Sequence, residues 1–228
     1  MLPPGAARRT PWDSAAFGLE TWEILRPEPE VLREAARTPG HYTVRLDPLT
    51  DKRVLHEHGF YYCDTLLEPA CARGELIAHP HPSASVSHEA PLEPMLALCR
   101  AGAFRHDRFH RDFNIDPARA DARYERWLGE LHAEGKVWGL AFAGESAGFI
   151  ALDGRRMVLH ALAESHRGRG LAKHLWSAAC GHFFDSLGLE ELESSVSAAN
   201  LPVVNLYASL GFRFRAAADL YHLYVGQL

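Results

Sequence analysis

The chain has 228 residues, of which 47% are apolar and 23% are charged; this is typical of a globular protein with one large core, or one domain and a small companion. Its formal net charge of −5 with histidine neutral argues against a general nucleic-acid binder. No uninterrupted apolar run approaches the roughly 20 residues that cross a bilayer, so we expect no membrane partner.

The cysteines predict a reducing environment. Cys63, Cys71, Cys99 and Cys180 form no CxxC pair and have no zinc-type spacing. The first ten residues carry two arginines with no apolar stretch after them, so we expect no secretory signal. We therefore predict reduced thiols and a cytoplasmic location.

The first third of the chain predicts a small α/β unit. Apolar and amphipathic runs alternate in the order β-α-β-α-β. We expect strands at 20–25, 41–46 and 60–67 and helices at 28–37 and 48–58. This unit looks too small for an independent two-sided core. The Pro- and Ser-rich stretch 79–85 is the predicted linker, which places the domains at 1–82 and 83–228.

The rest of the chain predicts a mixed sheet flanked by helices, an α/β (α+β) arrangement. We expect strands at 86–90, 137–142, 146–152, 157–163, 193–197, 212–215 and 220–225. We expect helices at 93–103, 116–134, 171–187 and 200–210.

Segment 157–172 contains the strongest local signal. An apolar strand is broken by Glu164, Ser165 and His166 and is followed by a basic, glycine-bearing turn. Free N–H groups at a helix start, glycines that admit a ligand, and the charges of Arg167 and Arg169 together predict a pyrophosphate site. The glycine spacing fits neither a Walker A loop nor the dinucleotide fingerprint. The alternative is that both arginines belong to a solvated face.

Two motifs resemble the GNAT N-acetyltransferase superfamily. Arg167, Gly170 and Ala172 form its acetyl-CoA signature R-x-x-G-x-A. The later segment 200–212 resembles N-x-x-A-x-x-L-Y-x-x-x-G-F, with Val203 in place of alanine. The resemblance implies a GNAT fold with a mixed central sheet, preceded by a partial GNAT-like N-terminal lobe. It also implies an acetyl-CoA-dependent N-acetyltransferase, an acyltransferase that needs no metal.

The resemblance also implies site residues. The pantetheine arm would pair with the central strand, and an N–H near Leu162 would bind the oxyanion. The expected acetyl-CoA contacts are Ala161, Leu162, Ala163, Arg167, Gly168, Arg169, Gly170, Leu171, Ala172 and Asn200. Asn200 could instead be only a helix cap. Tyr207 would be the catalytic acid that protonates the thiolate, although its position on an apolar helix stripe also fits a core residue.

The acceptor side is predicted from less specific patterns. Asp64 interrupts an apolar strand and is the candidate catalytic base, with Asp13 as another; each could be only a cap or a rim charge. Loop 104–113 alternates arginines with aromatics, and Arg105, Arg108 and Phe109 are the expected substrate-binding residues. A surface or partner-binding loop is the alternative. His106 and His110 lack a third ligand, so no metal is expected.

The N-terminal half resembles the dTDP-4-amino-4,6-dideoxygalactose (dTDP-fucosamine) N-acetyltransferases. The resemblance rests on WDSAAFG at 12–18, HEHGFYYCDT at 56–65, AFRHDRF at 103–109 and ARYERWL at 122–128. It implies a nucleotide-sugar acceptor used in polysaccharide biosynthesis. In that subfamily a glutamate follows the Gly-Phe pair, and here the shorter Asp64 follows Gly59 and Phe60. Alternatives are acetylation of a protein N-terminus or lysine, another small-molecule amine, or a non-catalytic acetyl-CoA-binding module. The exposed closing strands make a homodimer a further expectation.

Overall fold

The computed structural model describes residues 2–226, which form two compact units. Unit 1 comprises residues 2–66, 105–123 and 217–226, and unit 2 comprises 67–104 and 124–216. Three elements pass from one unit to the other: strand β4 (Tyr61–Ala72), helix α5 (Pro117–Ala133) and strand β11 (Arg213–Val225). The compact units therefore do not follow the boundary at 82/83, and the two predicted domains stay a prediction.

Unit 1 is built on a mixed sheet with the strand order β1-β2-β3-β11-β4. Strand β2 runs parallel to β3 and antiparallel to β1, and β3 runs antiparallel to β11. Its other elements are β1 (Ala7–Arg9), α1 (Pro11–Phe17), β2 (Thr21–Ile24), α2 (Pro29–Ala35), β3 (Gly40–Leu46) and α3 (Arg53–Glu57). Of the helix predicted over 48–58, only the segment of α3, residues 53–57, is helical.

The two faces of this sheet are covered by different segments. On β3, Tyr42 and Val44 point into an apolar core with Leu32 of α2 and Leu55 of α3. A second cluster joins Phe17 of α1 to a segment from the middle of the chain, and its members are Phe17, Phe109, Ile115 and Ala120. The sequence interpretation missed this second layer, because it comes from residues 105–123, far from the N-terminal third.

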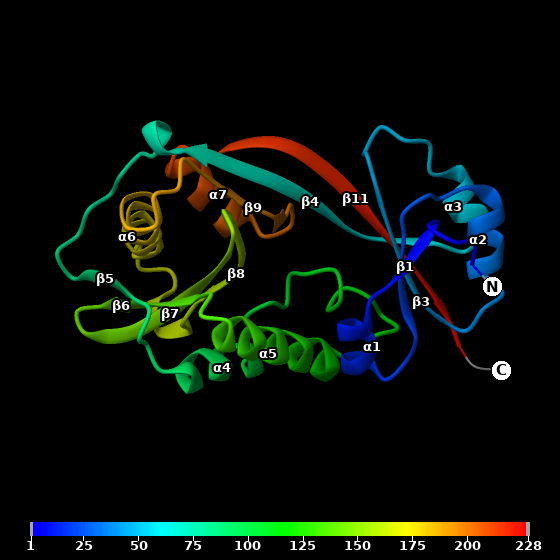
Figure 1. Cartoon of the computed structure of the whole chain (residues 1–228), viewed down its shortest axis with the longest axis horizontal. Coiled ribbons are helices and arrows are strands. Elements are labelled where there is room, and N and C mark those ends of the chain that lie inside the picture. The colour runs from blue at the N-terminus through cyan, green and yellow to red at the C-terminus, as the bar shows by residue number, and fades with distance from the viewer. Residues whose placement is uncertain (1, 227–228) are drawn as a thin grey trace. The chain divides into compact units, whose positions relative to one another are not determined.

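Unit 2 contains a mixed sheet of order β4-β9-β8-β7-β6-β5 (Figure 1). Strand β9 runs antiparallel to β4 and parallel to β8, and the pairs β8 with β7, β7 with β6 and β6 with β5 are antiparallel. The remaining elements are β5 (Ala84–Ser87), α4 (Leu92–Arg100), β6 (Val137–Phe142), β7 (Glu145–Asp153), β8 (Arg156–Leu162), α6 (Ala172–Asp185), β9 (Glu191–Ser194), β10 (Val196–Ser197) and α7 (Leu201–Ser209). The predicted mixed sheet flanked by helices is confirmed.

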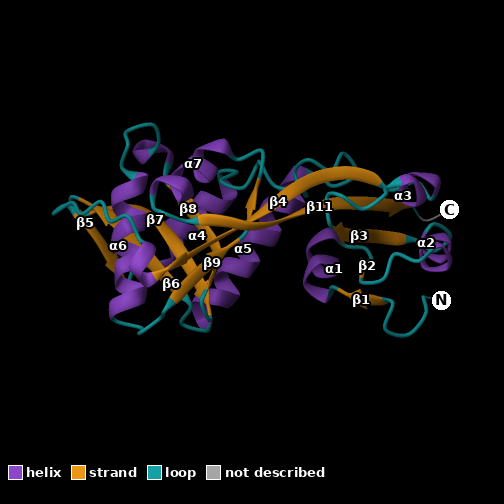
Figure 2. Ribbon diagram, turned by 90° about the horizontal axis from the view of Figure 1, so that it is seen from above, coloured by secondary structure: helices purple, strands orange, loops and turns teal. Residues whose placement is uncertain are grey.

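Helices cover both faces of the unit 2 sheet (Figure 2). Leu175 and Phe183 of α6 lie in one core cluster with Tyr207 of α7, and Leu128 of α5 lies in the other. On α6, Leu175, Ala179 and Phe183 recur every fourth residue as a buried apolar stripe, whereas Leu187, at the end of the helix predicted over 171–187, lies beyond α6 and is exposed. Among the residues that the structure describes, no helix is long and apolar enough to cross a membrane.

The two predicted closing strands are one continuous strand, β11. Residues 216–219 contain no glycine or proline that would end a strand. The polar Asp219 is held within unit 1, where Lys52 pairs with it at 3.0 Å and the Thr65 hydroxyl donates to it at 2.6 Å. These contacts keep the chain extended where the sequence alone suggested a break.

Candidate functional site

Strand β8 carries a β-bulge at Val158. Met157 pairs with Leu152 of β7, and Leu159 pairs with Ala151, the neighbour of Leu152. Two residues further along β8 thus correspond to one residue along β7, so Val158 is the extra residue. A bulge re-aims the side chains that follow it, because the inward and outward alternation shifts by one position. Met157 and His160 therefore lie on the same side of the sheet, towards α6 and α7.

The pairing of β8 with β9 (Glu191–Ser194) ends at the bulge, because β9 ends there. Their pairing covers only Arg156 with Glu193 and Met157 with Ser194, although β8 continues to Leu162. The Ala163 N–H donates to Ala147 of β7 at 2.7 Å, so by strand alternation the Leu162 N–H points to the opposite, open edge. The Leu162 carbonyl accepts a hydrogen bond from Arg167 Nε at 2.8 Å. The segment 161–163, where the pantetheine arm is expected, thus has one edge without a strand partner among the described residues.

The turn after β8 presents backbone groups to open space. Gly168 and Gly170 have φ values of 70° and 72°, the left-handed region that glycine adopts most easily. A Cβ added at either glycine would meet no atom within 4 Å. Arg167 and Arg169 are exposed on either side of Gly168, and α6 begins at Ala172. Successive N–H groups in such a turn form a concavity that suits an anion.

Tyr207 lies in a directed chain of hydrogen bonds. Its hydroxyl lies 2.8 Å from His160 Nε2 and donates to Ser194 Oγ at 2.9 Å, and Ser194 donates to the Met157 carbonyl at 2.9 Å. Because the phenol has one proton and gives it to Ser194, His160 Nε2 must carry a proton and donate to the Tyr207 oxygen. The sequence interpretation identified Tyr207 but missed His160 and Ser194.

Burial sets the protonation states in this chain. The side chain of Tyr207 is fully buried, which raises the pKa of its phenol well above the usual value near 10. His160 packs against Trp176 with ring centroids 5.3 Å apart, and burial lowers its pKa to about 4. At neutral pH the imidazole and the phenol are therefore both uncharged.

The low pKa of His160 predicts a pH-dependent stability. The unfolded chain binds a proton on this residue below pH about 6.5, whereas the folded protein does so only below about 4. The free energy of unfolding should therefore fall as the pH drops from 6.5 towards 4, by up to about 3 kcal/mol from this residue. Urea unfolding between pH 7 and 5 measures the slope. His160→Gln should flatten it, and an equal slope in both proteins would contradict the prediction.

Asn200 occupies the N-cap position of α7, but its side chain makes no capping hydrogen bond. The interpretation of Asn200 as a cap was therefore wrong in this respect. The turn is closed by its backbone instead, whose carbonyl accepts from the N–H groups of Val203 and Val204 at 3.0 Å each. The cofactor contact predicted for Asn200 stays a prediction.

The predicted acceptor-side residues lie in unit 1. Asp64 is buried, and its Oδ1 accepts hydrogen bonds from Arg111 at 3.0 Å and from the Thr65 N–H at 2.9 Å. Asp13, the other candidate base, is buried and bound by Arg123 at 2.5 Å. Both carboxylates are thus ion-paired, and the base role of Asp64 stays a prediction.

Phe109 is a core residue of unit 1. It is 2% exposed, and its ring lies 5.1 Å from that of Phe17. Two guanidinium groups lie against it, that of Arg108 at 4.5 Å and that of Arg123 at 4.6 Å from the ring centroid. The ring is thus covered by protein in this structure, and the substrate contact predicted for Phe109 stays a prediction. Arg105 is exposed, and Arg108 is partly buried.

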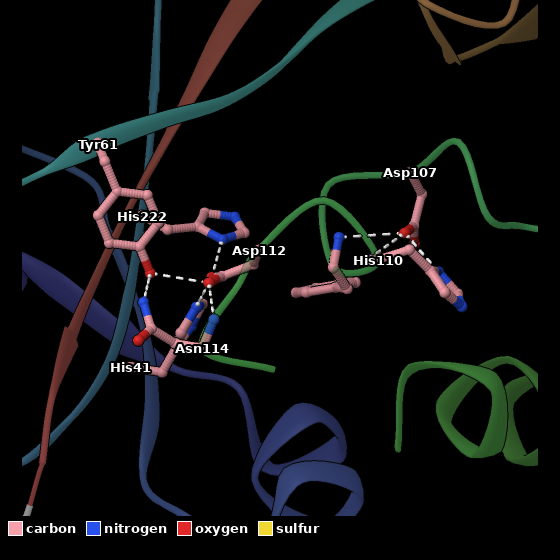
Figure 3. A network of polar contacts seen from close by, with 8 residues as sticks. His41, Tyr61, Asp107, His110, Asp112, Asn114 and His222 are labelled. Carbon is pink, nitrogen blue, oxygen red and sulfur yellow. Dashed lines mark hydrogen bonds and ion pairs between the residues drawn. The ribbon is translucent and has the colours of Figure 1, made fainter. Parts of the chain in front are cut away.

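A second buried polar network lies in unit 1 around Asp112 (Figure 3). Its Oδ2 accepts from His41 Nε2 and His222 Nδ1, each at 2.8 Å. Its Oδ1 accepts from the Tyr61 hydroxyl and the Asn114 N–H, each at 2.9 Å. Burial alone would raise the pKa of Asp112, but these hydrogen bonds outweigh it and hold that pKa well below its usual range. Burial lowers the pKa of His222 to about 4.

Three members of this network could in principle ligate a metal. One atom each of His41, Asp112 and His222 lies within 4.8 Å of the others. In a tetrahedral zinc site with bonds of about 2.0–2.1 Å, neighbouring ligand atoms lie about 3.3 Å apart. Both nitrogens are 2.8 Å from the carboxylate oxygen, which is the distance of an N–H···O hydrogen bond. The arrangement therefore suits a hydrogen-bonded network better than a zinc site.

The comparison with known sequences identifies a domain. Residues 101–212 match the sequence model of the acetyltransferase (GNAT) family. No curated protein matches the chain. The matched range contains β8, the glycine turn, α6 and Tyr207, so the elements of the candidate site lie within the GNAT domain.

Solved structures share the fold at low sequence identity. A GCN5-related N-acetyltransferase from Sphaerobacter thermophilus is 12% identical, over 97% of this chain and 77% of that protein, with a TM-score of 0.63. One from Kribbella flavida is 16% identical over 92% and 83%, with a TM-score of 0.55. A tandem GNAT protein from the clavulanic acid biosynthesis pathway is 13% identical over 91% and 76%, with a TM-score of 0.56.

The structural similarities confirm the mixed α/β GNAT fold. The match of residues 101–212 to the acetyltransferase (GNAT) family agrees with the predicted enzyme class, an acetyl-CoA-dependent N-acetyltransferase. The structural similarities cover more than 90% of this chain, so the likeness in fold is not confined to residues 101–212. None of these three proteins is described as a nucleotide-sugar acetyltransferase.

Proposed function

We propose that this chain, whose residues 101–212 form a GNAT acetyltransferase domain, transfers acetyl from acetyl-CoA to the amine of a small acceptor. The observation that carries the proposal is the buried chain of His160, Tyr207 and Ser194 beside the open edge of β8. A proton donor and an unpaired strand edge next to an anion-binding turn are what acetyl transfer from a thioester needs.

Different residues of unit 2 would bind the pyrophosphate, the pantetheine arm and the oxyanion. The turn formed by Arg167, Gly168, Arg169, Gly170, Leu171 and Ala172 would hold the pyrophosphate, and Asn200 would add a contact. The strand edge at Ala161, Leu162 and Ala163 would pair with the pantetheine arm. The outward Leu162 N–H would donate to the oxyanion that forms when the amine attacks the thioester carbonyl.

Tyr207 is the proposed catalytic acid. When the C–S bond breaks, the departing thiolate would take the phenolic proton. Burial keeps the phenol protonated at neutral pH, because it raises the pKa of Tyr207. The His160 N–H lies 2.8 Å from the phenolic oxygen and would stabilise the charge left on it. The attacking amine must lose a proton, and Asp64 is the proposed base.

For the acceptor we propose a dTDP-linked amino-dideoxy sugar, such as dTDP-4-amino-4,6-dideoxygalactose. The support is the resemblance of the N-terminal segments and the presence of Arg105 and Arg108 in loop 104–113, because guanidinium groups suit a diphosphate. A cytoplasmic location, a role in polysaccharide biosynthesis and a homodimer belong to the same proposal.

The test is release of thiol from acetyl-CoA with a panel of amines: dTDP-amino sugars, N-terminal peptides, spermidine and an aminoglycoside. Turnover with a dTDP-amino sugar alone would support the whole proposal. Turnover with a peptide or another amine would keep the acetyltransferase and reject the sugar. Acetyl-CoA binding without turnover on any amine would favour the non-catalytic module.

Gly170→Ala should weaken acetyl-CoA binding at least tenfold. The φ of 72° costs an L-residue about 1 kcal/mol, and the new methyl group would project into the space that the pyrophosphate needs. Gly188→Ala is the matched control, because Gly188 has a φ of 68° and equally open surroundings outside the turn. Calorimetric titration with acetyl-CoA compares the two variants. Equal affinity in both would show that the turn at Gly170 does not approach the cofactor.

A further inference from the structure

Unit 1 contains its own pocket, of about 220 Å³, on the polar face of its sheet. Strand alternation places His41, Thr43 and Arg45 on that face of β3, opposite the apolar side chains of Tyr42 and Val44. The strand register adds Arg8 and Glu23, which lie in one row with Thr43 across β1, β2 and β3. Arg108 of loop 104–113 also lines the pocket.

The charges in this pocket do not balance. Glu23 is paired with Arg8, and Asp13 is paired with Arg123. Arg108, by contrast, makes no hydrogen bond or ion pair with any residue from 2 to 226, and its Nε is buried without a partner. Its contact is the ring of Phe109, 4.5 Å away. A partly buried guanidinium with unused donors favours an anion beside it, because unpaired buried donors are costly.

His41 supplies a second polar group to the pocket. The residue is only 2% exposed and lines the cavity. Its Nε2 donates to the Asp112 carboxylate, so the other ring nitrogen, Nδ1, is left without a protein partner in the described part of the chain. Asp112 is itself fixed by His222, Tyr61 and Asn114 (Figure 3). The imidazole is thus held in one orientation by a network that the proposed acetyl transfer does not use.

We propose that this pocket binds the phosphoryl group of a small phosphorylated molecule, with Arg108 as its principal cation and His41 at its floor. A guanidinium matches the oxygens of a phosphoryl group in a bidentate manner. The Thr43 hydroxyl can donate to the same group, and His41 Nδ1 can accept the proton of a phosphoryl hydroxyl. Trp12 in the pocket lining is 49% exposed and offers an apolar surface to the rest of the molecule.

This inference extends the acceptor contact proposed for Arg108, and it rests on unit 1 alone. A nucleotide-linked acceptor would carry the required phosphoryl group, but so would any other small organic phosphate. The inference can therefore fail while the acetyltransferase proposal holds, and the reverse is equally true.

The experiment titrates the full chain with inorganic phosphate and with glucose 1-phosphate at constant ionic strength adjusted with NaCl. Nitrogen-15 NMR follows the His41 ring nitrogens and the Arg108 Nε–H, and calorimetry gives the affinity. We expect saturable binding that moves both sets of signals. A tighter affinity for glucose 1-phosphate would identify an organic phosphate as the ligand, and equal affinities would identify free phosphate. Chemical shifts that change without saturating would overturn the proposal. Saturable binding in calorimetry that leaves the His41 and Arg108 signals unmoved would overturn it as well.

Arg108→Gln should weaken phosphate binding at least tenfold, and Arg108→Lys should weaken it less because the charge remains. Arg33→Gln is the matched control, since Arg33 is an exposed arginine of α2 in the same unit, and its affinity should not change. Equal affinity in Arg108→Gln and Arg33→Gln would reject Arg108 as the cation. Acetyl-CoA binding, measured in parallel, separates a failure of this site from a failure of the proposed function.

Discussion

Tyr207→Phe should lower kcat by about 10²- to 10⁴-fold and leave the affinity for acetyl-CoA within about twofold. The substitution removes the only proton that the residue can give to the departing thiolate. It leaves the aromatic ring in the core, where Tyr207 packs 4.8 Å from Phe212. Steady-state kinetics with the best acceptor of the panel, together with calorimetric titration of acetyl-CoA, would measure both quantities.

The variant also has a structural cost that must be separated from catalysis. His160 and Ser194 would lose a hydrogen-bond partner, which costs about 1–3 kcal/mol in a buried site. Tyr42→Phe is the matched control, because it removes another buried phenol hydroxyl, one that donates to the Thr38 carbonyl in unit 1. It should lose stability without losing kcat. If Tyr207→Phe kept full turnover, the residue would be a core tyrosine and the acid would lie elsewhere.

Asp112→Ala should lower the free energy of unfolding of unit 1 by about 3–5 kcal/mol, the cost of breaking a buried charged network by removing one partner. The carboxylate accepts four hydrogen bonds from His41, His222, Tyr61 and Asn114. Without it, the imidazole donors of His41 and His222 stay buried and unpaired. Urea unfolding followed by circular dichroism, with the tyrosine and tryptophan fluorescence as a second probe, would measure the change.

Asp116→Ala provides the comparison for Asp112. It removes an aspartate from the same segment, whose carboxylate lies at the start of α5 and accepts from the Ala118 N–H at 2.9 Å. Loss of such a contact costs about 1 kcal/mol. Equal destabilisation by the two variants would mean that the network around Asp112 contributes no more than a helix cap.

Local patterns in the sequence predicted much of unit 2. The glycines at 168 and 170, the apolar stripe of α6 and the spacing from Asn200 to Phe212 are all short-range features, because they depend on backbone conformation and helix period within one segment. The same features predicted the mixed sheet and the place of Tyr207. The long strand β11 was missed, because contacts of Asp219 with Lys52 and Thr65, distant in sequence, keep it extended.

The sequence by itself thus determined the fold class, the candidate anion-binding turn and the candidate acid, since each is encoded within one or two neighbouring elements. Only the tertiary structure decided that Val158 forms a bulge and turns His160 towards Tyr207. It also decided that Phe109 is buried and that Asp112 joins His41 to His222. The physical reason is that burial and hydrogen-bond partners are set by packing between distant segments, 110 residues apart for Asp112 and His222 and 154 for Thr65 and Asp219, which no local pattern in one sequence records.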